Sequence, residues 1–197
     1  MEKNLRKKLI FALTALSFTC TGLLSGTEIV RKPAGEPYTD ANTGVSFPAR
    51  MDTFEKVSVR INPDPRYGTV IAYENETGTF ADVFIYRLEV DAAKPLTTPL
   101  YQAHVKETIQ KILTMNQQSK QIKSVKQLPP ENAPLIKDMA KFRIVVQDEA
   151  FISVLYLMSQ KQHIIKIRIT YSEQMETEHA AVQEFIKLIL AAVNHKP

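Results

Sequence analysis

Residues 139–172 read MAKFRIVVQDEAFISVLYLMSQKQHIIKIRITYS and contain three runs rich in apolar and β-branched residues, at 139–147, 150–159 and 163–172. Only a few polar residues separate these runs. Gaps of this length are typical of hairpins, so the stretch predicts an antiparallel meander of three strands. The middle run carries apolar residues at both parities, which indicates a central strand that is covered on both faces.

The chain on either side of the meander predicts further strands and two main helices. Strands are expected at 44–48, 54–61, 67–74, 80–90 and 121–128, and the residues NETGT predict a hairpin turn after the third of them. One helix begins near Leu100, and the last helix carries an apolar stripe made of Val182, Phe185, Ile186, Ile189, Leu190 and Val193. This order of elements predicts an α+β fold, a mostly antiparallel sheet with two main helices packed on it.

The N-terminus has the pattern of a secretory signal peptide. Basic residues precede an apolar run that ends near Leu24, and two small residues follow it. We therefore expect a signal peptide at 1–26, an irregular lead-in at 27–43 and a single domain at 44–197. Export would place the protein in the periplasm or in association with the cell envelope.

Cys20 is the single cysteine of the chain and raises the question of a lipid anchor. A lipoprotein signal would have small residues directly before the cysteine, whereas Phe18 and Thr19 stand there. An ordinary residue of the signal peptide is the favoured interpretation, and a lipoprotein anchored through Cys20 is the alternative. If cleavage falls near Gly26, no thiol remains for a disulfide or a nucleophile.

The excess of basic charge is concentrated in the predicted signal peptide. The formal net charge is +4, from 25 Lys and Arg against 21 Asp and Glu. Residues 1–26 hold four basic residues and one acidic residue, so 21 basic and 20 acidic residues remain without them, a net +1. Nucleic-acid binding requires a clustered basic surface on the mature domain, so we expect no nucleic-acid partner.

Motifs of common catalytic chemistry are absent from the sequence. It contains no GxSxG, HExxH, Walker loop or GxGxxG. His104 with Glu107, and Glu176 with His179, have i,i+3 helical spacing, but exposed polar residues are the favoured interpretation over a metal site. Asp82 lies in an apolar strand and would need a partner if it is buried. We predict no catalytic residue, no metal and no cofactor, with an enzyme that uses Asp82 or His104 as an alternative.

Alternation within the meander predicts a surface of interest. If the strands pair as hairpins, one face collects a core that includes Phe142, Leu155 and Ile167, and the other face collects Lys141, Arg143, Ile152, Val154, Tyr156, Met158, Lys166, Arg168 and Thr170. Either a helix or loop covers the apolar middle of the second face, or that face is a groove with an apolar floor and basic walls. In a groove, Lys141, Arg143, Tyr156, Lys166 and Arg168 would bind an anionic amphiphile or an acidic partner segment.

The element order resembles the PsbP/Mog-type α/β/α sandwich, in particular DcrB-like small bacterial envelope proteins. The resemblance runs from the GVSFP strand through SVLYLMSQKQHIIKIRITY to the AVQEFIKLIL helix, over residues 44–194. It implies an accessory, chaperone-like or partner-binding scaffold, and no site residue is carried over from it.

We therefore expect an exported, non-enzymatic accessory or partner-binding protein of the bacterial cell envelope, with a protein partner. A carrier for a small anionic or lipid-like ligand is the alternative. Weak contact with a membrane or lipid, and the oligomeric state, stay open.

Overall fold

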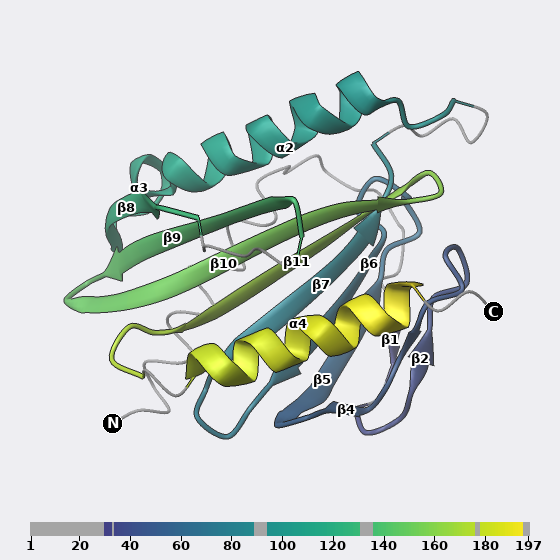
Figure 1. The fold of residues 1–197 in the computed structure, drawn as a ribbon, viewed down its shortest axis with the longest axis horizontal. Coiled ribbons are helices and arrows are strands. Elements are labelled where there is room, and N and C mark those ends of the chain that lie inside the picture. The colour runs from purple at the N-terminus through teal and green to yellow at the C-terminus, as the bar shows by residue number, and fades with distance from the viewer. Residues whose placement is uncertain (1–29, 33, 89–93, 131–135, 176–177, 195–197) are drawn as a thin grey trace.

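A computed structural model of the protein describes residues 30–32, 34–88, 94–130, 136–175 and 178–194 (Figure 1). The predicted signal peptide at 1–26 lies outside the described residues. The elements in chain order are β1 (Val30–Lys32), β2 (Tyr38–Thr39), β3 (Ser46–Phe47), β4 (Arg50–Met51), β5 (Phe54–Ile61), β6 (Thr69–Glu74), β7 (Phe80–Tyr86), α2 (Thr98–Leu113), α3 (Met115–Gln118), β8 (Ile122–Leu128), β9 (Asp138–Val146), β10 (Glu149–Gln160), β11 (His163–Ser172) and α4 (Glu178–Asn194).

Most of these strands form one antiparallel sheet. Within the described residues the sheet has nine strands in the order β1-β5-β6-β7-β11-β10-β9-β8, with β4 paired to β5 beside this path. The strands β2 and β3 form a separate antiparallel pair. The predicted lead-in at 27–43 therefore contributes the edge strand β1 as well as β2. With α2 and α4 packed on the sheet, the predicted α+β class is confirmed.

The predicted meander is present, with β10 paired to both β9 and β11. Gln147 and Lys161 lie in its two turns with φ of 56° and 55°, the left-handed conformation that tight hairpin turns require. Residues 151–157 of β10 are all buried, which confirms the prediction of a central strand covered on both faces.

Pairing of β11 with β7 joins the meander to the N-terminal hairpins. The β6–β7 hairpin has the turn predicted at 75–79. Because β7 and β11 lie far apart in the sequence, this pairing brings together side chains that no local pattern connects. It places Asp82 directly opposite Arg168.

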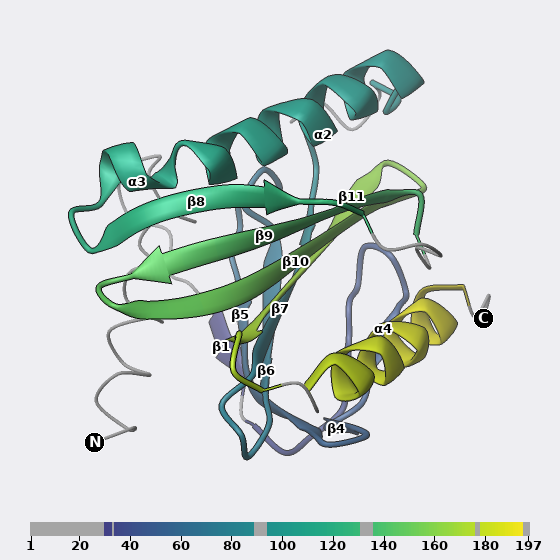
Figure 2. The same cartoon turned by 60° about the vertical axis from the view of Figure 1, so that its left-hand side comes forward.

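The helices α2 and α4 lie on opposite sides of the twisted sheet (Figure 2). Helix α2 begins where the side chain of Thr97 accepts a hydrogen bond from the Leu100 amide, and it buries Tyr101 and Val105. Two hydrophobic cores result. The α2 core includes Phe142, Ile144, Leu155 and Leu157, and the α4 core includes Ile71, Tyr73, Val154, Tyr156, Ile165, Ile167 and Phe185.

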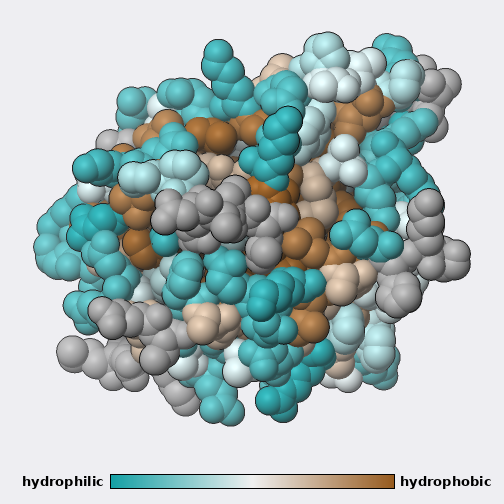
Figure 3. Space-filling model, viewed as in Figure 1, coloured by the Kyte–Doolittle hydropathy of each residue, from teal (hydrophilic) through white to brown (hydrophobic). Residues whose placement is uncertain are grey.

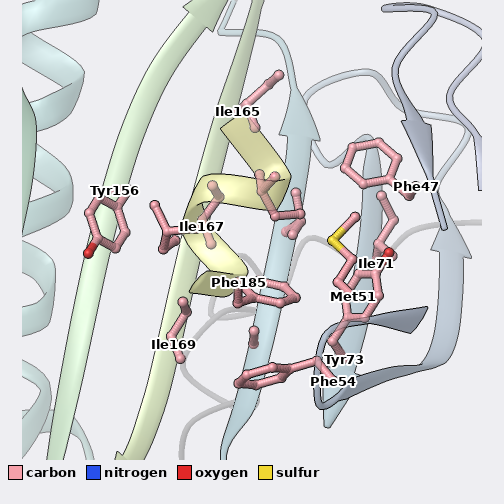
Figure 4. Packing of buried hydrophobic residues seen from close by; sticks show 14 of the residues in the cluster. Phe47, Met51, Phe54, Ile71, Tyr73, Tyr156, Ile165, Ile167, Ile169 and Phe185 are labelled. Atoms are coloured by element: carbon pink, nitrogen blue, oxygen red, sulfur yellow. The ribbon is translucent and has the colours of Figure 1, made fainter. Parts of the chain in front are cut away.

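Phe185 lies at the centre of the α4 core, among residues of the N-terminal strands (Figure 4). Its ring centroid is 4.5 Å from that of Phe54 and 5.3 Å from that of Tyr73, the latter in an edge-on arrangement. Aromatic pairs with such spacing add to the gain from burial alone. The predicted stripe of the last helix is therefore its contact with the sheet.

The predicted register of β10 against β11 was wrong. Leu155 pairs with Arg168 and Tyr156 pairs with Ile167, so Lys166 and Arg168 share a face with Leu155 and not with Tyr156. The turn between these strands is shorter by one residue than the gap that the sequence indicated. A shift of one residue moves every side chain of a strand to the other face.

Figure 3 shows hydrophobic side chains gathered between α4 and the strands of the meander, with hydrophilic side chains around them. Among the described residues, no helix has the length and apolar character required to cross a membrane.

Candidate functional site

Three charged residues occupy neighbouring positions on the α2 side of the sheet. Asp82 of β7 faces Arg168 of β11 across the strand pair, and Lys166 lies two residues before Arg168 on the same side. We call Asp82, Lys166 and Arg168 the charged strip. Helix α2 covers the β8–β10 half of this side, and the strip lies beside the core that forms there.

Arg168 is held in place by the meander. It is 9% exposed, and its Nε donates a hydrogen bond of 3.0 Å to the Ser153 hydroxyl, which also accepts a 3.0 Å bond from Thr170. One terminal nitrogen of Arg168 lies 3.8 Å from the sulfur of Met115, a weak acceptor. Burial lowers the pKa of Arg168 to about 10, against the opposing effect of Asp82, so the guanidinium stays charged at neutral pH.

Lys166 extends over two aromatic rings of β7. Its ammonium nitrogen lies 3.9 Å from the ring centroid of Phe84 and 5.7 Å from that of Tyr86, distances typical of a cation–π interaction. Burial lowers the pKa of Lys166 to about 8, and repulsion from Arg168 adds to this effect. Within the described residues, the side chain of Lys166 makes no hydrogen bond or ion pair.

Asp82 lies among cations but forms no direct ion pair within the part of the chain that the structure describes. Burial raises the pKa of its carboxyl, although Arg60, Arg168 and Lys166 oppose the rise. None of the polar atoms of the strip is among the fully buried atoms that lack a partner. Asp82 and Lys166 are half-buried, whereas Arg168 is buried, so the strip is largely but not completely withdrawn from water.

His104 of α2 contacts Tyr86, whose ring also lies near the Lys166 ammonium. The Tyr86 hydroxyl and His104 Nε2 are 2.6 Å apart, and the two rings pack edge to face with centroids 5.6 Å apart. Burial, together with the charge of Lys166, lowers the pKa of His104 to about 4, so the imidazole is neutral at neutral pH. In the tautomer protonated at Nδ1, the neutral ring accepts at Nε2 the hydrogen bond that the Tyr86 hydroxyl donates.

The residues of the predicted groove do not come together. Lys141, Arg143 and Tyr156 lie on the α4 side of the sheet, whereas Lys166 and Arg168 lie on the α2 side. Tyr156 is 1% exposed, and the apolar middle of its face belongs to the α4 core. The structure therefore supports, for that face, the alternative in which a helix covers the apolar middle, and that helix is α4.

Arg143 has a partner of its own at the surface. Its Nε donates to both carboxylate oxygens of Glu173, at 2.7 and 2.9 Å. This ion pair raises the pKa of Arg143 and lowers that of Glu173. Lys141 and Arg143 therefore lie on the opposite face from Lys166 and Arg168. The residue that lies beside these two cations is Asp82.

Of the two helical His and Glu pairs, only His104 and Glu107 lie wholly within the described residues. Glu107 contacts Lys111 at 2.6 Å, and Glu176 lies outside the described residues. In the described part of the chain no three His, Cys, Asp or Glu residues gather at a spacing suited to a metal ion.

Sequence reasoning singled out Asp82, Lys166 and Arg168 but did not join them. The available signals were an acid in an apolar strand and the alternation of Lys166 and Arg168 with isoleucines. The strip itself depends on the pairing of β7 with β11, which no local motif specifies.

Comparisons with known proteins add little to this site. No protein-family model and no curated protein matches the chain. The chain is similar to the solution structure of cyanobacterial PsbP (CyanoP) from Synechocystis sp. PCC 6803, with 12% sequence identity and a TM-score of 0.40 over 89% of this chain and 97% of that one. A likeness of this size carries no argument about function, and the similarity to DcrB-like proteins stays a prediction.

Proposed function

We propose that the protein is an exported, non-enzymatic accessory protein of the bacterial cell envelope that acts by binding a partner. The charged strip is the observation that carries this proposal. Asp82, Lys166 and Arg168 are partly or fully withdrawn from water on the sheet without direct ion pairs to one another. Desolvated charges lower stability unless they are well paired, and perturbed groups of this kind gather at functional sites.

Arg168 suits a binding role better than proton-transfer chemistry. Arg168, oriented by Ser153, keeps its proton because its pKa is lowered only to about 10. A permanently charged planar guanidinium recognises carboxylate and phosphate groups. General acid–base catalysis instead favours a group whose pKa lies near the working pH.

The experiment follows the full-length chain, with a C-terminal affinity tag, in its own cells. Cells are fractionated, the N-terminus of the recovered protein is read by mass spectrometry, and partners are trapped by crosslinking before purification. We compare the wild type with Lys166→Gln/Arg168→Gln. The matched control is Lys141→Gln/Arg143→Gln, which changes a Lys and an Arg two residues apart on the opposite face.

We expect a trimmed N-terminus near Gly26, recovery in the envelope fraction, and a defined crosslinked partner that only the strip variant loses. A mature N-terminus at a lipid-modified Cys20 would select the lipoprotein alternative within the same proposal. Recovery of the untrimmed chain in the cytoplasm, or a partner that both double variants retain equally, would overturn it.

A further inference from the structure

The strip holds more positive than negative charge. Lys166 and Arg168 are successive residues on one side of β11, so their Cα atoms lie about 7 Å apart. Their repulsion contributes to the lowered pKa of Lys166. Asp82 is the single acid within the strip, and Arg60 of β5 adds a further positive charge to its surroundings. A second anion would balance the strip.

The two cations also keep donors available for such an anion. Ser153 uses only the Nε of Arg168, and the remaining contact to the Met115 sulfur is weak. The Lys166 ammonium rests on the Phe84 ring, an interaction that leaves its N–H groups free to donate. A guanidinium and an ammonium side by side suit the oxygens of a carboxylate or a phosphate.

We propose that the charged strip binds one small anionic group, a phosphate or a carboxylate, which lies beside Lys166 and Arg168 and is repelled by the nearby Asp82 carboxylate. The inference rests on the proposed function and names the chemistry recognised by the same site. The limited exposure of Arg168, 9%, favours a single small group, free or projecting from the partner, over contact with a flat surface.

Asp82 repels the bound anion, so binding is coupled to proton uptake by Asp82. Protonation of Asp82 removes the repulsion. Within the described residues, other charged or titratable groups on this side of the sheet include Arg60 and Glu55 of β5, Glu74 of β6, Tyr86 of β7, Tyr101, His104, Glu107 and Lys111 of α2, and Asp138 of β9. Asp82→Asn imitates the protonated carboxyl at every pH and separates its effect from theirs.

The test is isothermal titration calorimetry on the protein in the form that cells accumulate, with inorganic phosphate and acetate as probes. A second arm uses vesicles of phosphatidylglycerol, which present phosphate groups on a lipid surface. The proteins compared are the wild type, Asp82→Asn, Lys166→Gln/Arg168→Gln and the control Lys141→Gln/Arg143→Gln. Circular dichroism establishes that each variant is folded.

We expect saturable binding of a free anion that is lost in the Lys166→Gln/Arg168→Gln variant, unchanged in the control, and at least about tenfold tighter in Asp82→Asn, because one like charge is removed at short range. Binding to vesicles alone, with the same response to the variants, would assign the group to a lipid headgroup.

An unchanged or weakened affinity in Asp82→Asn would overturn the inference, even if the Lys166→Gln/Arg168→Gln variant does not fold. Absence of binding to every probe would also overturn it. If the crosslinked partner is still lost only in the strip variant, the proposed function survives that failure.

Discussion

The buried His104 is expected to contribute to the sensitivity of the fold to mild acid. Burial and Lys166 hold the pKa of His104 at about 4, below its ordinary value of 6.5. The unfolded chain therefore binds this proton at a higher pH than the folded chain does, and stability falls as the pH drops from about 6.5 to about 4. We predict that His104→Gln reduces this loss by on the order of 2 kcal/mol, measured by urea unfolding at several pH values.

The exposed His179 of α4 provides the control for this prediction. His179→Gln makes the same chemical change at an exposed position of the other main helix. His163, whose pKa burial also lowers, contributes in the same direction as His104, so the His104 variant retains part of the loss. An identical acid dependence in His104→Gln and the wild type would show that the imidazole is not held neutral by its surroundings.

At the scale of elements, a buried carboxylate fixes the start of α4 to the β6–β7 turn. Glu178 is 3% exposed and accepts hydrogen bonds from the Asn75 amide, at 2.9 Å, and from the Thr79 hydroxyl. Burial alone would raise the pKa of Glu178, but the hydrogen bonds outweigh it and the pKa is lowered. The contact therefore joins segments about a hundred residues apart in the sequence.

We predict that Glu178→Ala lowers the free energy of unfolding by about 2–3 kcal/mol, since it leaves the amide and hydroxyl donors buried without their acceptor. Denaturant unfolding measures the change. Glu184→Ala is the matched control on the same helix, because Glu184 contacts Lys187 at 2.9 Å at the surface. Its effect should stay within about 0.5 kcal/mol. Equal effects of the two changes would mean that the Glu178 contact does not anchor the helix.

At the scale of the whole molecule, the sequence was sufficient for features that depend on local pattern. The strands of the meander, the hairpin at 75–79 and the apolar stripe of α4 follow from alternation, turn residues and helical period. The sequence did not predict which face of the sheet each residue of β11 occupies. The register of β11 against β10 depends on the length of the turn around Lys161. The pairing of Asp82 with Arg168 could not be predicted from the sequence, since it depends on a long-range contact between β7 and β11.

The charged strip also makes a prediction about the stability of the molecule as a whole. If Asp82, Lys166 and Arg168 are retained for binding, their replacement by apolar residues of similar size should stabilise the fold while it abolishes recognition. Desolvated charges at such positions are often replaced with a gain of about 1–4 kcal/mol. We therefore expect Asp82→Leu/Lys166→Met/Arg168→Met to unfold at a higher urea concentration than the wild type and to bind neither the partner nor an anion.

The outcome separates a site from a structural network. Arg168 bonds to Ser153, and Thr170 shares that hydroxyl, so the triple change also leaves hydroxyl groups behind on the sheet. If these hydrogen bonds contribute more to stability than the buried charges cost, the free energy of unfolding of the triple variant will fall by more than about 2 kcal/mol, as expected for a broken buried network. Such a loss of stability would show that the strip serves to stabilise the fold. A gain in stability together with loss of binding would leave recognition as the reason why two cations and an acid occupy the middle of this sheet.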